Sequence, residues 1–145
     1  MKVNTFILIV FSLILLACAN NPKPITYGSD GCHYCSMTIV DMQHAAQLMT
    51  KKGRTYTFDA SECMINHLRE IDKTTVAVFL VNDYNTPGAT IDATNATYLI
   101  SKNIPSPMGE YLSAFATRES AEYALEKNDG ELFTWEELQN RFKQK

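Results

Sequence analysis

Two stretches of this chain repeat one order of secondary-structure signals, and this repetition constrains the fold most. In each stretch, two short segments with strand character precede an amphipathic helix and a further strand segment. An offset of 57 residues aligns Phe58 with Phe115 and Glu62 with Glu119, so that a strand end and a helix start fall at matching positions. We therefore predict an α+β fold in which two similar ββαβ halves and a C-terminal helix pack into one compact domain.

The first half consists of β-branched or alternating segments around a capped helix. Asp59 and Glu62 have the spacing of a capping box at the start of this helix. The last strand is apolar almost throughout, which is typical of a central strand buried on both faces. In chain order, we predict strands over Met37–Met42, Ala45–Met49 and Thr55–Phe58, a helix over Ala60–Ile71 and a strand over Val76–Val81.

The second half has clearer helix boundaries. Thr117 is a candidate N-cap, and Thr134 with Glu137 forms a second capping box. Leu138 and Phe142 lie on one face of the helix that this box opens. In chain order, we predict strands over Thr97–Ile100 and Tyr111–Phe115, a helix over Arg118–Lys127, a strand over Glu131–Phe133 and a terminal helix.

The first residues are typical of an export signal. One positive charge, Lys2, precedes an apolar run from Phe6 to Ala17, which is shorter than the about 20 residues that a membrane-spanning helix needs. The segment Leu15–Cys18 resembles a bacterial lipobox, in which the cysteine is acylated and becomes the first residue of the mature chain. We therefore expect removal of residues 1–17 and lipidation of Cys18, and an anchor with several acyl chains is stable.

The expected lipid anchor indicates how the chain is divided into segments and where in the cell the protein lies. Residues 18–30 are polar and punctuated by prolines, as expected of a flexible tether. The folded domain then covers residues 31–145, with halves at about 31–85 and 86–145. We expect the protein at the cell membrane or the outer membrane, facing the periplasm. In that oxidising compartment a free thiol pair tends to form a disulfide unless something holds it reduced.

Composition and motifs argue against two classes of function. The chain has 13 Lys and Arg against 16 Asp and Glu, a net charge of −3, and no basic stripe of the kind that binds nucleic acid. It contains no G-x-S-x-G elbow, no Gly-rich phosphate loop and no H-E-x-x-H motif. We therefore expect neither nucleic acid binding nor an enzyme.

Soft ligand atoms are concentrated in one short segment. Cys32 and Cys35 form a C-x-x-C pair, and Met37 follows two residues later. On a strand, Cys35 and Met37 would point to the same side, and Cys32 could reach the same point across a turn. Two thiolates and a thioether select Cu(I) over harder ions, whereas a thioether is a poor zinc ligand. The segment therefore predicts a Cu(I) site.

Five further side chains are open candidates as ligands. Met108 lies in a Pro-Gly loop, where it either covers a metal or fills the core between the halves. Cys63 and His67 are four residues apart on one helix face, which suits a metal site, although a buried free cysteine beside Met64 more commonly acts as a small apolar residue. His33 and His44 are optional donors. The sequence leaves these roles undecided.

Three alternative interpretations of the cysteines remain. A structural disulfide between Cys32 and Cys35 would suit the oxidising compartment. A zinc site could combine this pair with Cys63 and His67. A thiol-disulfide lipoprotein would use the pair for exchange, although a thioredoxin-like dyad normally lies at a helix N-terminus, and here strand-forming residues follow.

At these residues the chain resembles the NosL family of copper-related lipoproteins. Three motifs in this order carry the resemblance: the C-x-x-C-x-M run of Cys32, Cys35 and Met37, then Thr57-Phe58-Asp59 with Glu62-Cys63-Met64, and finally Pro107-Met108-Gly109 with Ala114-Phe115. The family pattern commonly has glycine between the second cysteine and the methionine. Ser36 occupies that position here, which leaves the candidate ligands intact but changes the local turn.

The resemblance implies a fold and a function. The implied fold has two similar ββαβ halves, in agreement with the repeated pattern. The implied function is a Cu(I) metallochaperone that hands copper to an ABC-transporter-linked assembly complex for maturation of nitrous oxide reductase. The implied copper ligands are Cys32, Cys35, Met37 and Met108.

Overall fold

The computed structural model describes residues 21–144. The expected leader, Cys18 and the first residues of the expected tether lie outside the described residues. Within residues 21–144, no helix has the length and apolar character to cross a membrane.

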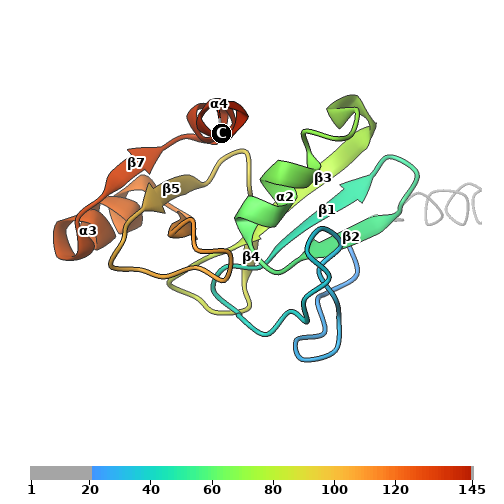
Figure 1. Ribbon diagram of the computed structural model, residues 1–145, viewed down its shortest axis with the longest axis horizontal. Coiled ribbons are helices and arrows are strands. Elements are labelled where there is room, and N and C mark those ends of the chain that lie inside the picture. Colours follow the sequence, from blue (N-terminus) through green and yellow to red (C-terminus); the bar gives the residue numbers. More distant parts are fainter. Residues whose placement is uncertain (1–20, 145) are drawn as a thin grey trace, which may run out of the picture.

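The described chain forms two antiparallel sheets with helices packed against them (Figure 1). The first sheet has the strand order β2-β1-β3-β4, and the second has the order β6-β5-β7. The elements of the first half are β1 (Ala46–Thr50), β2 (Thr55–Phe58), α2 (Ser61–His67), β3 (Val76–Asn82) and β4 (Thr90–Asp92). Those of the second are β5 (Thr97–Ile100), β6 (Leu112–Phe115), α3 (Arg118–Asn128), β7 (Glu131–Phe133) and α4 (Trp135–Lys143).

Both halves have the same topology, which confirms the prediction of an α+β fold from two ββαβ units. In each half the first strand is central and pairs with the second and third strands. The last residues of β2 and β6, Phe58 and Phe115, pair with Ala46 and Thr97 and are fully buried. The offset of 57 residues in the sequence therefore relates structurally equivalent positions.

One predicted strand is wrong, and one observed strand was not predicted. The segment Met37–Met42 forms no strand, and its contribution to pairing is a single bridge between Gly31 and Thr38. Its β-branched residues favour extended backbone, but Ser36 adopts a left-handed φ of 64° and folds the chain back on itself. In addition, β4 (Thr90–Asp92), for which the sequence predicted no element, extends the first sheet.

The first helix is shorter than predicted and is not capped by Asp59. Ala60 is the N-cap residue of α2 and makes no capping hydrogen bond through its side chain. Glu62 does not complete a capping box, because its carboxyl group is buried and bonded to Ser106. The predicted caps in the second half are confirmed: Thr117 accepts from Ser120, and Thr134 forms a capping box.

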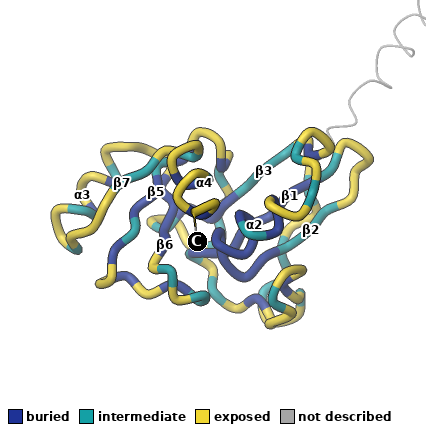
Figure 2. Tube along the Cα trace, turned by 45° about the horizontal axis from the view of Figure 1, so that its top comes forward, coloured by how far each residue is buried: buried dark blue, intermediate teal, exposed yellow. Residues whose placement is uncertain are grey.

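One apolar core joins the two halves (Figure 2). Residues from the first sheet and α2 pack with residues from the second sheet and α4, and the two predicted α4 residues, Leu138 and Phe142, are buried. The largest buried members include Leu48, Phe58, Met64, Leu68, Tyr98 and Leu112. The core therefore fixes α2 relative to the loop that precedes β6.

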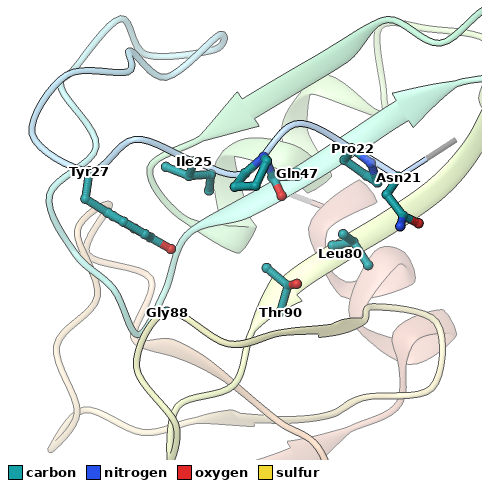
Figure 3. Close-up of a pocket in the computed structure, with 9 residues that line it drawn as sticks. Asn21, Pro22, Ile25, Tyr27, Gln47, Leu80, Gly88 and Thr90 are labelled. Atoms are coloured by element: carbon teal, nitrogen blue, oxygen red, sulfur yellow. The ribbon is translucent and has the colours of Figure 1, made fainter. Parts of the chain in front are cut away.

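The start of the described chain lies against the first sheet (Figure 3). The Gln47 side chain donates a hydrogen bond to the Lys23 carbonyl oxygen (2.7 Å), and the Asn82 side chain donates one to the Tyr27 hydroxyl (2.6 Å). Ile25 and Tyr27 pack on the core. Residues 23–30, which belong to the expected tether, are thus held by specific contacts.

The turn between α3 and β7 provides a test of this packing. Gly130 has a φ of 126°, and a Cβ atom there would clash with the Ile100 carbonyl oxygen. We expect Gly130→Ala to lower the free energy of unfolding by about 3 kcal/mol, because a backbone clash adds to the conformational strain. Urea denaturation measures this change.

Gly53→Ala is the matched control for Gly130→Ala. Gly53 also has a positive φ, 82°, but a methyl group added there would meet no atom of another part of the chain within 4 Å. Strain alone should cost about 1 kcal/mol at this position. Equal losses in the two variants would contradict the close approach of β5 to the turn that contains Gly130.

Candidate metal centre

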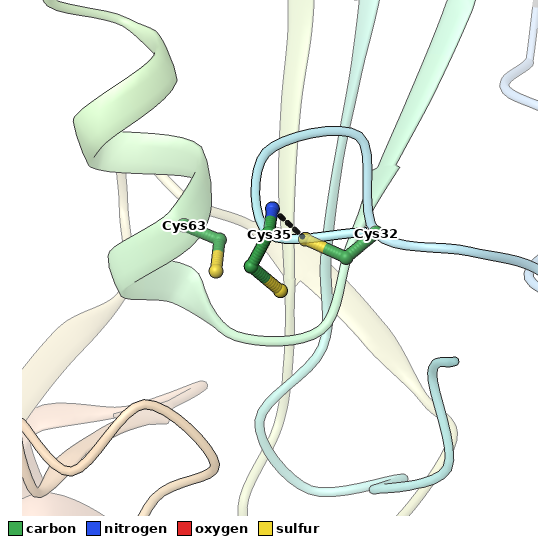
Figure 4. A group of neighbouring side chains, drawn as sticks. All are labelled: Cys32, Cys35 and Cys63. Atoms are coloured by element: carbon green, nitrogen blue, oxygen red, sulfur yellow. Dashed lines mark hydrogen bonds between the residues drawn. The ribbon is translucent and has the colours of Figure 1, made fainter. Parts of the chain in front are cut away.

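Three cysteine sulfur atoms meet between the loop before β1 and the first turn of α2 (Figure 4). Cys32 and Cys35 come from the loop of residues 31–38, here called the cysteine loop, and Cys63 comes from α2. The three Sγ atoms lie within 4.8 Å of one another. Cys32 and Cys63 are buried, whereas Cys35 is partly exposed and gives the group access to solvent.

The cysteine loop is docked on the free edge of β2. The His33 N–H donates to the Thr57 carbonyl oxygen (2.8 Å), and the Thr57 hydroxyl donates to the Gly31 carbonyl oxygen (3.1 Å). Inside the loop, the Cys32 N–H donates to the Met37 carbonyl oxygen (2.7 Å). Because α2 follows β2 after two residues, the same edge strand brings Cys63 to the loop.

Hydrogen bonds concentrate negative charge on Cys32. The Cys63 thiol donates to its sulfur, as do backbone N–H groups including that of Cys35 (3.4 Å), and together they lower the pKa of Cys32 to about 4 against the opposing effect of burial. The bond to Cys32 and burial raise the pKa of Cys63, and partial burial raises the pKa of Cys35. At neutral pH the group therefore holds one thiolate and two thiols.

Two histidines and a tyrosine flank the sulfur group. The ring centroids of His33 and His67 lie 4.9 Å apart in an edge-on arrangement, and the ring centroid of Tyr56 lies 4.5 Å from that of His33. Burial and the neighbouring His33 lower the pKa of His67, which keeps this imidazole neutral. Within residues 21–144, no histidine or carboxylate joins the three sulfurs at 4.8 Å.

His44 does not join the three sulfurs, and its ring nitrogens have other partners. Its Nδ1 lies 3.0 Å from an Asp41 carboxylate oxygen, and its Nε2 lies 3.2 Å from the Ser113 hydroxyl of β6. Both ring nitrogens are thus engaged in a contact that links the two halves. Of the open histidine candidates, His44 has a structural role and the other two stay near the sulfur group.

The two candidate methionines differ in their exposure. The Met37 side chain is 52% exposed, and its backbone carbonyl is bonded to Cys32. Because the predicted strand is absent, spacing along a strand no longer supports a common direction for Cys35 and Met37. Met108 is partly buried and packs on the core that contains Cys63.

A buried carboxyl group ties the Met108 loop to α2. The Ser106 hydroxyl donates to Glu62 Oε1 (2.5 Å) and accepts from the Tyr111 N–H (2.9 Å). Burial raises the pKa of Glu62, and its second oxygen has no hydrogen-bond partner among the described residues. Since Glu62 precedes Cys63, this contact holds the Met108 loop beside the helix turn that carries the third sulfur.

The structure thus brings together Cys32 and Cys35 as the sequence suggested and adds Cys63, whose role the sequence left undecided. The helical spacing of Cys63 and His67 after an edge strand was the available signal. Metal binding by Met37 and Met108 remains a prediction.

The charge state of the group can be measured directly. Reduced, metal-free protein should show the ultraviolet absorbance of one thiolate at pH 7, and half of that signal should disappear near pH 4. Cys63→Ala should raise the pKa of Cys32 by removing the donor, whereas Cys63→Ser, which retains a hydroxyl donor, should raise it less. A thiolate signal that appears only above about pH 8, as for a free cysteine, would contradict this assignment.

Known proteins with a similar fold and a similar sequence support the architecture described above. A solved structure described as the copper chaperone NosL from Shewanella denitrificans is similar with a TM-score of 0.71 and 22% identity, over 81% of this chain and 95% of that one. The copper-binding lipoprotein NosL of Stutzerimonas stutzeri is 27% identical over 125 residues. This match covers 80% of the present chain, which spans 66% of the length of that relative, slightly less than two thirds.

A sequence profile of one family matches most of the chain. The matched region covers residues 23–142 and includes the cysteine loop, both sheets and nearly all of α4. The repeated ββαβ topology and the motif order agree with this match. The chain belongs to the NosL family.

Proposed function

We propose that this protein is a membrane-anchored carrier of Cu(I), with the ion as its cargo rather than a resident cofactor. The observation that carries the proposal is the convergence of three cysteine sulfurs within 4.8 Å. The lowered pKa of Cys32 favours a thiolate among them. Two relatives with copper in their names support the choice of metal. The anchor would be the lipid on Cys18.

The chemistry of the group favours Cu(I) over zinc. Thiolates and thioethers are soft ligands that select Cu(I), which accepts low coordination numbers. A structural zinc site requires four ligands, commonly thiolate, imidazole or carboxylate. No fourth ligand of these types lies with the sulfurs among the described residues. Binding of Cu(I) would release the protons of Cys35 and Cys63.

The exposure of the ligands supports transfer by ligand exchange. Cys32 and Cys63 would hold the ion in the buried part of the site, while Cys35 lies at its solvent-accessible edge. We propose that the exposed Met37 and the partly buried Met108 complete the site as thioether ligands. A partner's sulfur could then enter at the Cys35 side and take the ion without its release into water.

We propose an extracytoplasmic copper enzyme as the final recipient. By the family's role, the recipient would be nitrous oxide reductase, reached through an ABC-transporter-linked assembly complex. The protein would then act at the periplasmic face of the cell membrane or the outer membrane and would not itself be an enzyme.

A thiol-disulfide function is the second candidate. The low pKa of Cys32 and its proximity to Cys35 favour disulfide exchange as well as metal binding. The described C-x-x-C pair lies in a loop docked on a strand, however, and not at a helix N-terminus.

Anaerobic titration with Cu(I) against a strong chelator distinguishes the two candidates. We expect one ion per chain, and we expect Cys63→Ser to weaken binding by more than the 10- to 100-fold typical of changes outside the coordination shell. Circular dichroism confirms that the variant is folded. If Cys63→Ser binds Cu(I) normally and Cys35→Ser abolishes disulfide exchange with a dithiol substrate, the redox function replaces the carrier.

The methionines require a separate titration. Met37→Leu and Met108→Leu should each weaken Cu(I) binding at least tenfold, because removal of a ligand should cost no less than the roughly 10-fold lower bound for loss of an outer-shell partner. Met42→Leu is the matched control, because Met42 is 44% exposed and lies outside the cysteine loop. An effect of Met42→Leu equal to that of Met37→Leu would remove Met37 from the ligand set.

A further inference from the structure

The turn between β1 and β2 forms a basic surface. Lys51, Lys52 and Arg54 are all exposed, and no acidic residue occurs from Met42 to Phe58. Within residues 21–144, none of the three cations forms an ion pair, and the Arg54 guanidinium lies 4.7 Å from the centre of the Tyr56 ring. This end of the first sheet therefore carries a cluster of positive charge. Lys51 also attracts the nearby Asp72, whose pKa is lowered mainly by its bonds to Thr74 and in part by Lys51.

The start of the described chain reaches the same end of the sheet. Lys23 is exposed and borders a cavity together with Thr55, the residue that directly follows the turn. Asn21 and Pro22 line the same pocket as Leu80 of β3, and the chain runs along the sheet from Tyr27 toward Asn21 (Figure 3). The four cations Lys23, Lys51, Lys52 and Arg54 are called the basic face below.

The contacts of the docked segment leave only a short part of the expected tether between the lipid anchor and the folded domain. The Lys23 carbonyl oxygen is bonded to β1, and Cys18 lies five positions before Lys23 in the chain. Five fully extended residues span at most about 18 Å. A domain of this size is roughly 35 Å across, so a lipid on Cys18 would keep the side of the domain that carries Lys23 next to the bilayer.

We propose that the basic face contacts anionic lipid headgroups of the membrane that holds the anchor. This inference rests on the lipid anchor of the proposed function and is independent of copper binding. Headgroup phosphates attract exposed Lys and Arg side chains within about one Debye length of the surface. The contact would orient the domain, because α3 and β7 lie at the opposite end of the molecule (Figure 1).

In this orientation the metal centre would lie near the membrane. The cysteine loop binds Thr57, three residues beyond Arg54 on β2, which corresponds to about 10 Å along the strand. The partly exposed Cys35 would then lie close to the membrane surface but outside the contact itself. A partner embedded in the same membrane could reach it there.

Lysine acetylation of the complete lipidated chain in vesicles tests the basic face. The two lipid compositions are phosphatidylcholine alone and phosphatidylcholine mixed with phosphatidylglycerol. At low salt, we expect acetylation of Lys23, Lys51 and Lys52 to slow about fivefold in the anionic vesicles, while Lys102 and Lys127 react equally in both. Salt at about 1 M should abolish the difference.

Two charge-matched variants complete the experiment. Lys51→Gln/Lys52→Gln/Arg54→Gln should remove the protection of Lys23, whereas Lys102→Gln/Arg118→Gln/Lys127→Gln in the second half should retain it. Equal acetylation of a vesicle-bound chain in both lipids, or protection of Lys102 and Lys127 as well, would overturn the proposal. A chain that does not float with vesicles would overturn the anchor and the basic face together, with the copper titration unaffected.

Discussion

The candidate site depends on the hydrogen bonds that dock the cysteine loop on the outer edge of β2. An edge strand has a row of backbone groups without partners, and Thr57 uses both its carbonyl oxygen and its hydroxyl to hold His33 and Gly31. This contact carries Cys32 and Cys35 to the start of α2. Without it, the sulfur of Cys63 would be an isolated buried thiol, and the C-x-x-C pair would belong to a free loop.

The two halves share a topology but not a site. The position equivalent to Cys63, 57 residues later, is Ser120, whose backbone N–H bonds the helix cap Thr117. No loop in the second half places cysteines beside α3, since the described cysteines all belong to the first half. The second half contributes instead through the Met108 loop, which the bond between Ser106 and Glu62 holds against α2. The first half therefore supplies the three cysteine sulfurs, and the second half supplies the Met108 loop that packs beside them.

Local signals in the sequence predicted the regular elements and failed where the fold depends on distant contacts. The strand Thr55–Phe58 and the capping box at Thr134 were correct because alternation and capping act over a few residues. The strand over Met37–Met42 was wrong because the backbone reversal at Ser36 and the docking on Thr57 outweigh the propensity of β-branched residues. The role of Cys63 stayed undecided for the same reason, since its partners are about 30 residues away in the chain.

X-ray absorption at the copper edge of the Cu(I)-loaded protein tests most directly whether the three cysteine sulfurs bind one ion together. We predict a first coordination shell dominated by sulfur, with a measurable loss of sulfur scattering in each of Cys32→Ser, Cys35→Ser and Cys63→Ser. A shell dominated by nitrogen or oxygen, or one that is unchanged when Cys63 is replaced, would contradict it.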